Sequence, residues 1–266
     1  MTAIREPLKI GRRLATATRV AACMLSRGVW DLISDPNAAM SYWRQIATIS
    51  LSPGGDDGGE LLVLPKCDID QLIPVAESIP VTLIDYRHAY GDVPLQELIT
   101  LCKIARYRQP RVVFEIGTYL GGTTVQIAAN SDAKVYTLDL PPPNHKDYVE
   151  PRILNPELDV FPDHLGVRIQ DSPHASKIHQ LVGDSLVFDF TPYHNSVDFV
   201  FIDGSHHYDC VFRDSQNALR MKSGRGVIIW HDYAPYAPGV VKALNDLGTK
   251  VPLVHIADTS LVLHCG

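Results

Sequence analysis

Acidic and histidine side chains gather after two apolar segments in the second half of the chain. Asp203 directly follows one apolar run, His206 lies three residues further on, and His231 and Asp232 directly follow the next run. If the two runs are neighbouring parallel strands, their carboxyl ends bring Asp203, His231 and Asp232 together. Two carboxylates at such an edge repel each other unless a cation lies between them.

This set of side chains predicts a divalent metal site and a general base. A metal ion held by Asp203, His231 and Asp232 would bind two oxygens of a diol-type substrate. His206, with an unperturbed pKa of about 6.5, would remove a proton from a hydroxyl group. Two alternatives stay open. The acids could share protons or bind the substrate directly instead of a metal. His206 could be a solvated turn residue, which is the role that we expect for His207.

A second group of residues predicts a cofactor loop. Glu115 lies near the end of an apolar run, which is followed by Gly117, Gly121, Gly122 and a helical pattern. Glycines let the backbone approach a ligand, and a helix N-terminus offers free N–H groups. The spacing differs from the G-x-G-x-x-G pattern of dinucleotide sites. Glu115 would repel a pyrophosphate but pair with the ammonium of a methionyl tail, which favours S-adenosylmethionine.

Two further acids end strand-like segments. Asp139, at the tip of the second segment, can accept hydrogen bonds from both hydroxyls of a ribose, and capping a loop is its alternative role. Asp184 lies between Gly183 and Ser185, where it can accept from the amino group of an adenine or cap the next segment. Both acids follow the glycine loop in the order expected for a nucleotide-type ligand.

Alternating strands and helices must position these residues. Runs that are apolar without alternation predict strands covered on both faces, as in a parallel sheet. Such runs are Val112–Ile116, Val135–Leu140, Ile178–Val182, Val197–Ile202 and Val227–Trp230. Helical patterns cover 124–130, 210–221, 240–247 and a segment after Pro94 in which Leu95, Leu98, Ile99, Cys102 and Ala105 share one face. Two short strands, 251–256 and 260–264, predict a terminal hairpin, and the whole pattern predicts a doubly wound α/β sheet.

The bulk properties favour small-molecule chemistry. The 266 residues allow one large domain with an appendage, and 45% hydrophobic with 20% charged residues is ordinary globular usage. A net charge of −6 without a long basic block gives no sign of nucleic-acid binding. Five scattered cysteines without C-x-x-C spacing suggest reduced thiols and a cytoplasmic location. No uncharged run near the N-terminus is long enough to span a bilayer.

The first 60 residues form a separate region, predicted to be a helical arm followed by a flexible linker. The linker contains the glycine- and aspartate-rich stretch 52–59, and the α/β domain is predicted over 61–266. Six basic residues precede Asp31 with a single acid, Glu6, among them. This composition fits an arm that packs on its own domain or makes a homo-oligomer. A transit peptide or a membrane-surface helix are the alternatives.

Taken together, the motifs resemble class I S-adenosylmethionine-dependent methyltransferases. They are residues 114–124, Gly183-Asp-Ser185, and 201–208 with His231-Asp232. The likeness covers about residues 85–264 and points to the branch with metal-dependent catechol and sugar O-methyltransferases. It implies a seven-stranded Rossmann-like sheet whose last strand is antiparallel. It also implies cofactor contacts from Glu115, Gly117, Thr118, Tyr119, Gly121, Gly122 and Thr123, from Asp139 to the ribose, and from Gly183, Asp184 and Ser185 on the adenine side.

The resemblance also implies a mechanism. In metal-dependent members the positions of Asp203 and Asp232 hold magnesium, and that of His206 is the base in sugar-modifying enzymes. His231 departs from the usual Asp, Glu or Asn; a nitrogen ligand would shift preference toward manganese, iron or zinc, unless His231 does not ligate. The implied reaction is attack of a small-molecule hydroxyl on the methyl group of S-adenosyl-L-methionine, with Mg²⁺ or Mn²⁺ bound. The proline-rich segment 141–173, with His145, Tyr148, Arg152 and nearby Lys177, is predicted to form a lid.

Three rival functions remain at this point. The first is a nicotinamide-dependent oxidoreductase on a similar sheet, which the glycine spacing and Glu115 disfavour. The second is a metal-dependent hydrolase or oxygenase that uses His206, His231 and the acids. The third is a non-catalytic S-adenosylmethionine-binding protein, in which substitution of His206 or Asp203 would change no activity.

Overall fold

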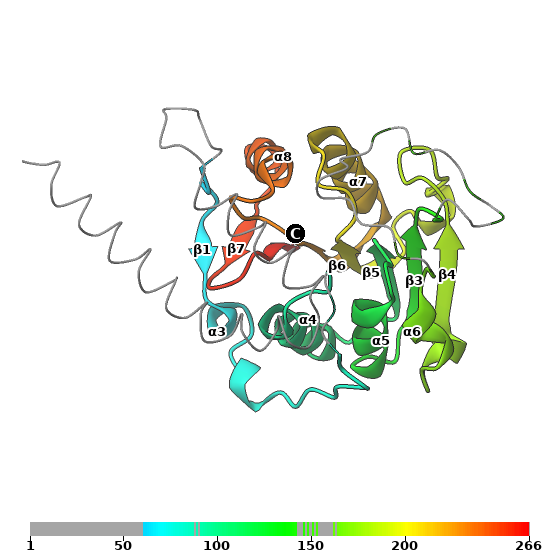
Figure 1. Cartoon of the computed structure of the whole chain (residues 1–266). Helices are drawn as coiled ribbons and strands as arrows, with labels where there is room; N and C mark the ends of the chain where they lie inside the picture. Colours follow the sequence, from blue (N-terminus) through cyan, green and yellow to red (C-terminus); the bar gives the residue numbers. More distant parts are fainter. Residues whose placement is uncertain are drawn as a thin grey trace, which may run out of the picture. The chain divides into compact units, whose positions relative to one another are not determined.

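A single mixed β-sheet with helices on both faces forms the described part of the chain (Figure 1). The computed structural model describes residues 61–87, 89, 91–142, 146, 148, 151, 153, 162 and 164–265. Its strands are β1 (Lys66–Cys67), β2 (Val112–Ile116), β3 (Lys134–Asp139), β4 (Ile178–Val182), β5 (Val197–Ile202), β6 (Lys222–Trp230), β7 (Val254–Ile256) and β8 (Val262–Cys265). Its α-helices are α3 (Ile69–Leu72), α4 (Leu95–Arg108), α5 (Gly122–Ala129), α6 (Val167–Gln170), α7 (Tyr208–Met221) and α8 (Pro238–Gly248). Short 3₁₀ turns cover Ala76–Ser78, Ala175–Lys177 and Thr191–Tyr193.

The strand order confirms the predicted doubly wound topology. Along the sheet the order is β1-β7-β8-β6-β5-β2-β3-β4. All neighbouring pairs are parallel except those of β8, which runs antiparallel to both β6 and β7. The predicted terminal hairpin is therefore β7 and β8. The seven expected strands are joined by the two-residue strand β1 at the edge beside β7.

The sheet separates two hydrophobic cores. Helices α7 and α8 cover one face, and α4, α5 and α6 cover the other (Figure 1). Strand β5 contributes to both cores, because its side chains alternate: Val200 and Ile202 pack on the α7 and α8 side, and Phe199 and Phe201 on the α4 and α5 side. Every residue of β5 is buried, as its unbroken apolar run predicted.

Two details differ from the sequence prediction. In α4 the predicted apolar face is partly wrong, since Leu95 is exposed and Glu97 is buried. The buried stripe starts at Glu97 because this turn of the helix faces a polar cluster of the sheet edge. The predicted start of the following strand at Val227 is also wrong, because α7 leads directly into β6. The helix ends at Met221, and β6 begins at once with Lys222, which pairs with Val197 of β5.

Some predictions fall outside the described residues. These are the arm and linker over 1–60 and, within the predicted lid, residues such as His145 and Arg152. The described end of the lid segment contains α6, which packs against α5. Among the described residues, no helix is long and apolar enough to cross a membrane.

Candidate active site

The carboxyl ends of β2, β3, β5 and β6 meet at one edge of the sheet. In the ladder, Glu115 of β2 lies opposite Thr137 of β3 and Phe201 of β5. Asp203 and His231 are the first residues after β5 and β6. Parallel strands therefore bring the predicted cofactor residue and the predicted metal residues to the same edge, where ligands bind in such sheets.

Glu115 is an almost fully buried acid whose two oxygens differ in their hydrogen bonding. Its Oε2 accepts hydrogen bonds from the hydroxyls of Thr124 and Thr137, the latter at 2.6 Å, while Oε1 has no partner among the described residues. Burial, helped by the nearby charges of Asp203 and Asp139, raises the pKa of Glu115 to about 8 although its hydrogen bonds with two threonines lower it. A buried, partly unsatisfied carboxyl beside two other acids favours a cationic ligand.

Asp139 holds the cofactor loop in place. Its Oδ2 accepts from the backbone N–H of Tyr119 at 2.7 Å, and its Oδ1 accepts from that of Leu140 at 2.7 Å. Burial raises the pKa of Asp139 to about 6. Tyr119 has a left-handed backbone with φ of 47°, which this hydrogen bond helps to stabilise. The loop-binding role is therefore realised in the structure, and the contact to a ribose stays a prediction.

The glycines of the loop allow neighbouring parts of the protein to pack closely against its backbone. A Cβ on Gly117, whose φ is 106°, would lie 2.0 Å from the carbonyl oxygen of Asp203. One on Gly121, with φ of 83°, would lie 2.6 Å from Ile169 Cγ1, and one on Gly122 would lie 2.6 Å from a side-chain nitrogen of α6. The missing side chains thus let the tip of β2 pack against the tip of β5, and the start of α5 against α6.

The remaining loop residues lie beside Glu115. Thr118 is buried, and its hydroxyl lies 2.6 Å from that of Thr137, which in turn donates to Glu115. Thr123 lies in the first turn of α5, where backbone N–H groups lack partners within the helix. These positions are consistent with the predicted contacts to a methionyl group.

Two buried acids, Asp184 and a second one on α7, lie where the adenine side of the site is predicted. Asp184 Oδ1 accepts from the N–H of Leu186 at 2.8 Å, so its capping role is present. Behind it lies Asp214 of α7, which is 2% exposed. Burial, with a contribution from the charge of Asp184, raises the pKa of Asp214 to about 7 although a hydrogen bond with Ser185 lowers it. Sequence reasoning missed Asp214.

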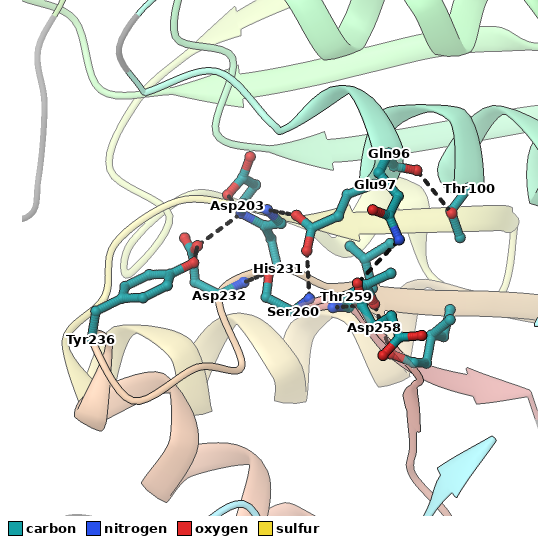
Figure 2. Close-up of polar contacts among 12 residues, drawn as sticks. Gln96, Glu97, Thr100, Asp203, His231, Asp232, Tyr236, Asp258, Thr259 and Ser260 are labelled. Carbon is teal, nitrogen blue, oxygen red and sulfur yellow. Dashed lines mark hydrogen bonds and ion pairs between the residues drawn. The ribbon is translucent and has the colours of Figure 1, made fainter. Parts of the chain in front are cut away.

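His231 lies at the centre of a network of acids (Figure 2). Its Nδ1 lies 2.9 Å from Asp203 Oδ1 and 3.1 Å from Asp232 Oδ1. On the opposite side of the ring, Nε2 lies 2.7 Å from Oε2 of Glu97. Burial alone would lower the pKa of His231, but the carboxylates of Asp232 and Asp203 hold it well above its ordinary value.

Asp232 joins the network to the predicted base. Its Oδ2 lies 2.7 Å from Nε2 of His206, and its Oδ1 accepts from the hydroxyl of Tyr236 at 2.5 Å. Burial would raise the pKa of Asp232, but the positive charge of His231 and the bond with His206 hold it well below its usual range. Asp232 has a φ of 61°, a left-handed conformation that directs its carboxylate toward both histidines.

The geometry of this cluster suits a single cation. Asp203, His231 and Asp232 each offer one ligand atom, and these atoms lie within 4.8 Å of one another. A cavity of about 10 Å³, lined by these residues and His206, adjoins them. The structure thus brings together all four residues that the sequence indicated, and their binding of a metal stays a prediction.

Other features of the site were not expected from the sequence. His207 is not simply solvated: its Nδ1 accepts from the N–H of Asp209 and caps the start of α7. Glu97, Tyr236 and Ser260 join the network without belonging to a motif. A cavity of about 260 Å³ lies to the side, among residues 84–87, 92 and 93, the start of α5 and α6, and is not lined by Glu115.

Comparison with known proteins agrees with this arrangement. Residues 114–233, from the end of β2 to just past β6, match a protein family described as a methyltransferase domain. The SAH-bound methyltransferase PaMTH1 of Podospora anserina is 14% identical in sequence. Its TM-score is 0.51, and the match covers 73% of this chain and 93% of that one.

Two O-methyltransferases are also similar. The enzyme from Bacillus cereus, solved with SAH, is 15% identical over 84% of this chain and 96% of that one, with a TM-score of 0.49. TomG from Streptomyces achromogenes, involved in tomaymycin synthesis and solved with SAM, is 15% identical over 77% and 92%, with a TM-score of 0.48. The likeness to PaMTH1 concerns the fold. The chain therefore has a Rossmann-like methyltransferase fold, and its strand-edge residues lie within the segment that matches a methyltransferase domain.

Proposed function

We propose that this protein is an S-adenosylmethionine-dependent methyltransferase that acts on a hydroxyl group of a small molecule. The observation that carries the proposal is the buried carboxyl of Glu115, which lies near Asp139 and Asp203 and whose Oε1 has no partner in the described part of the chain. S-adenosylmethionine carries a sulfonium and an ammonium group, so it supplies the missing positive charge. A dinucleotide would instead bring its pyrophosphate toward three acids, which disfavours the oxidoreductase alternative.

The protein's own groups would orient the cofactor. Asp139 fixes the backbone of Tyr119 and keeps acceptor capacity for ribose hydroxyls, since each carboxylate oxygen can accept more than one hydrogen bond. Asp184 and Ser185 follow β4 at the same sheet edge, beside the place expected for the adenine. Glu115 would ionise when the ammonium group of the cofactor arrives, because a nearby positive charge lowers its pKa.

The acceptor hydroxyl would be deprotonated by His206. Asp232 lies 2.7 Å from Nε2 of His206, so it fixes the ring and would stabilise the imidazolium that forms after proton removal. The same acid–histidine pairing orients the histidine base of the Ser-His-Asp triad. His206 and Asp203 follow the same strand, which keeps the base close to the acids that would bind the acceptor.

Asp203, His231 and Asp232 would hold a divalent metal beside the acceptor. Such an ion lowers the pKa of a bound hydroxyl and orients two adjacent oxygens of a substrate. Asp232 can serve both functions, because Oδ1 faces His231 and Oδ2 faces His206. The convergence of their three ligand atoms within 4.8 Å supports this assignment.

Calorimetric titration tests the cofactor assignment directly. We expect the full-length protein to bind S-adenosylmethionine and its demethylated product. The substitution Glu115→Gln should weaken binding by about tenfold or more, or about 1.4 kcal/mol, because a charged hydrogen bond is lost. Glu77→Gln removes the same charge at an exposed site and serves as the control. Binding of NAD with no binding of S-adenosylmethionine would overturn the proposal.

A further inference from the structure

Glu97 is a buried carboxylate that lies outside every motif of the chain. It comes from the first turn of α4 and is 7% exposed. Its Oε1 accepts from the backbone N–H of Ser260, just before β8, and its Oε2 lies 2.7 Å from Nε2 of His231. Figure 2 shows Glu97 reaching from α4 to both groups. Each of its oxygens therefore has a defined partner.

These partners determine where His231 carries a proton. A backbone N–H can only donate, and an ionised carboxylate can only accept. With Oε1 occupied by Ser260, the short contact of Oε2 to His231 requires a proton on Nε2. The other nitrogen, Nδ1, is then the atom turned toward Asp203 and Asp232, at 2.9 and 3.1 Å. Without a cation Nδ1 also carries a proton, because it faces two carboxylates. A metal bound between them would displace that proton, while Glu97 keeps the one on Nε2.

We propose that Glu97 is a positioning residue that holds one proton of His231 on Nε2, so that Nδ1 is the nitrogen that exchanges its proton for a metal. The part that concerns a metal rests on the proposed function. Histidine ligands of metals commonly donate their second N–H to a carboxylate, and loss of that partner weakens metal binding by about 10–100-fold. A nitrogen ligand also favours Mn²⁺ over Mg²⁺, which prefers oxygen.

The isosteric substitution Glu97→Gln should change which nitrogen of His231 keeps its proton. The N–H of Ser260 must still donate, so it holds the carbonyl oxygen of the new amide. The amide NH₂ group then faces Nε2 of His231, which has to become an acceptor and lose its proton. The ring keeps only the proton on Nδ1, which points at Asp203 and Asp232 and blocks the approach of a cation. The shape of the site is nearly unchanged, which separates this effect from a loss of packing.

The first experiment observes the ring directly. The full-length protein is labelled with ¹⁵N-histidine, and His231→Asn assigns the signals of His231 by their disappearance. We expect Nε2 of His231 to carry a proton in the parent protein and in the control Glu77→Gln. In Glu97→Gln we expect Nε2 to have lost it. The same Nε2–H signal in all three proteins would overturn the inference.

The second experiment measures metal binding by titration calorimetry with Mn²⁺ and Mg²⁺. We expect Glu97→Gln to weaken Mn²⁺ binding by about 10–100-fold, with Glu77→Gln unchanged. His231→Asn replaces the nitrogen by an amide oxygen and should reduce the preference for Mn²⁺ over Mg²⁺. In the His231→Asn background, Glu97→Gln should cost little further affinity, because the two residues act through one contact.

The possible outcomes separate the two proposals. If Glu97→Gln does not fold, the change in metal preference caused by His231→Asn still decides the inference, and an unchanged preference contradicts it. If the parent protein binds neither ion, the metal part of the proposed function fails. The assignment of the Nε2 proton to Glu97 then stands or falls by the ¹⁵N signals alone. Binding of S-adenosylmethionine is measured separately and tests neither point.

Discussion

At the scale of single residues, the candidate site contains several acidic side chains that are buried away from solvent. Burial raises the pKa of Glu115 to about 8, of Asp214 to about 7 and of Asp139 to about 6. Such groups change charge near neutral pH when a charged ligand arrives. Cofactor binding should therefore be coupled to proton release.

This coupling can be measured without knowing the acceptor. At about pH 7 the pKa of Glu115 keeps it largely protonated, and pairing with the ammonium group of S-adenosylmethionine lowers that pKa, so a proton leaves on binding. We expect the binding enthalpy to differ between phosphate and Tris, because the released proton is taken up by the buffer. Glu115→Gln should reduce the difference, and equal enthalpies for the parent protein would contradict this coupling.

The predicted base gives a second test at this scale. We expect His206→Asn to lower the rate of methyl transfer by roughly 10²–10⁴-fold, the usual contribution of a general base, with cofactor affinity unchanged. Formation of the demethylated cofactor is measured with a panel of catechols and sugars. The matched control is His207→Asn, since asparagine is a good helix cap and should preserve the cap of α7. Equal rates for the two variants would remove His206 from the mechanism.

At the scale of elements, the tips of β2 and β5 are in direct backbone contact. A Cβ on Gly117 would lie 2.0 Å from the carbonyl oxygen of Asp203, so Gly117→Ala must separate the two strand ends. With the added strain of its φ of 106°, we expect a loss of roughly 2–4 kcal/mol in the free energy of unfolding. Gly224→Ala is the control, because its Cβ would meet nothing within 4 Å. Denaturant unfolding of both variants measures the difference.

The elements also show how far the sequence could predict the structure. Strands such as β5 were predicted with the right bounds, because an apolar run buried on both faces leaves a continuous signal. The start of β6 was missed because Lys222-Ser-Gly-Arg-Gly226 is polar and glycine-rich, and only its pairing with β5 makes it a strand. The face of α4 was misjudged because a buried charge, Glu97, occupies a position that helical periodicity assigns to solvent.

The residues of the candidate site likewise fall into those that the sequence could predict and those that it could not. Acids and histidines at strand ends could be predicted, because their positions follow from local sequence and from the rule that parallel strands end at one edge. The bond between Glu97 and His231 could not, since the two residues are 134 positions apart and no local pattern couples them. Asp214 was missed for a related reason: it is a polar residue on a helix that becomes buried only when α7 packs behind Ser185.

At the scale of the whole molecule, the buried acids should control how stability depends on pH. For Asp214 the folded pKa of about 7 lies above the ordinary aspartate pKa of 3.8, so the folded state holds its proton more tightly. Stability is therefore lost as the pH rises from about 4 to about 7. The pKa values of Asp139 and Glu115 are also raised on folding. Their contributions to stability are therefore lost as the pH rises to about 6 and about 8, respectively. Asp198 acts oppositely: burial would raise its pKa, but bonds with Arg225 and Arg111 hold it low, so its contribution is lost only in strong acid.

We accordingly expect the cofactor-free protein to melt at a lower temperature at about pH 8 than at about pH 5, with each kcal/mol worth roughly 2–4 °C. Asp214→Asn removes one of the titrating groups and should make the melting temperature less dependent on pH. Calorimetric melting of both proteins across this range measures the effect. A melting temperature that rises toward pH 8 in the parent protein would contradict it.

The position of β8 has a consequence for how the protein is made. This strand lies between β6 and β7, and Ser260, just before it, donates to Glu97, the carboxylate that contacts His231. Helix α4 is synthesised early, so its Glu97 can make this contact only after a segment some 150 residues later in the chain has left the ribosome. A chain interrupted before Ser260 would contain every motif residue of the site yet lack the contact that orients Glu97. Premature termination should thus yield an inactive protein instead of a partly competent one.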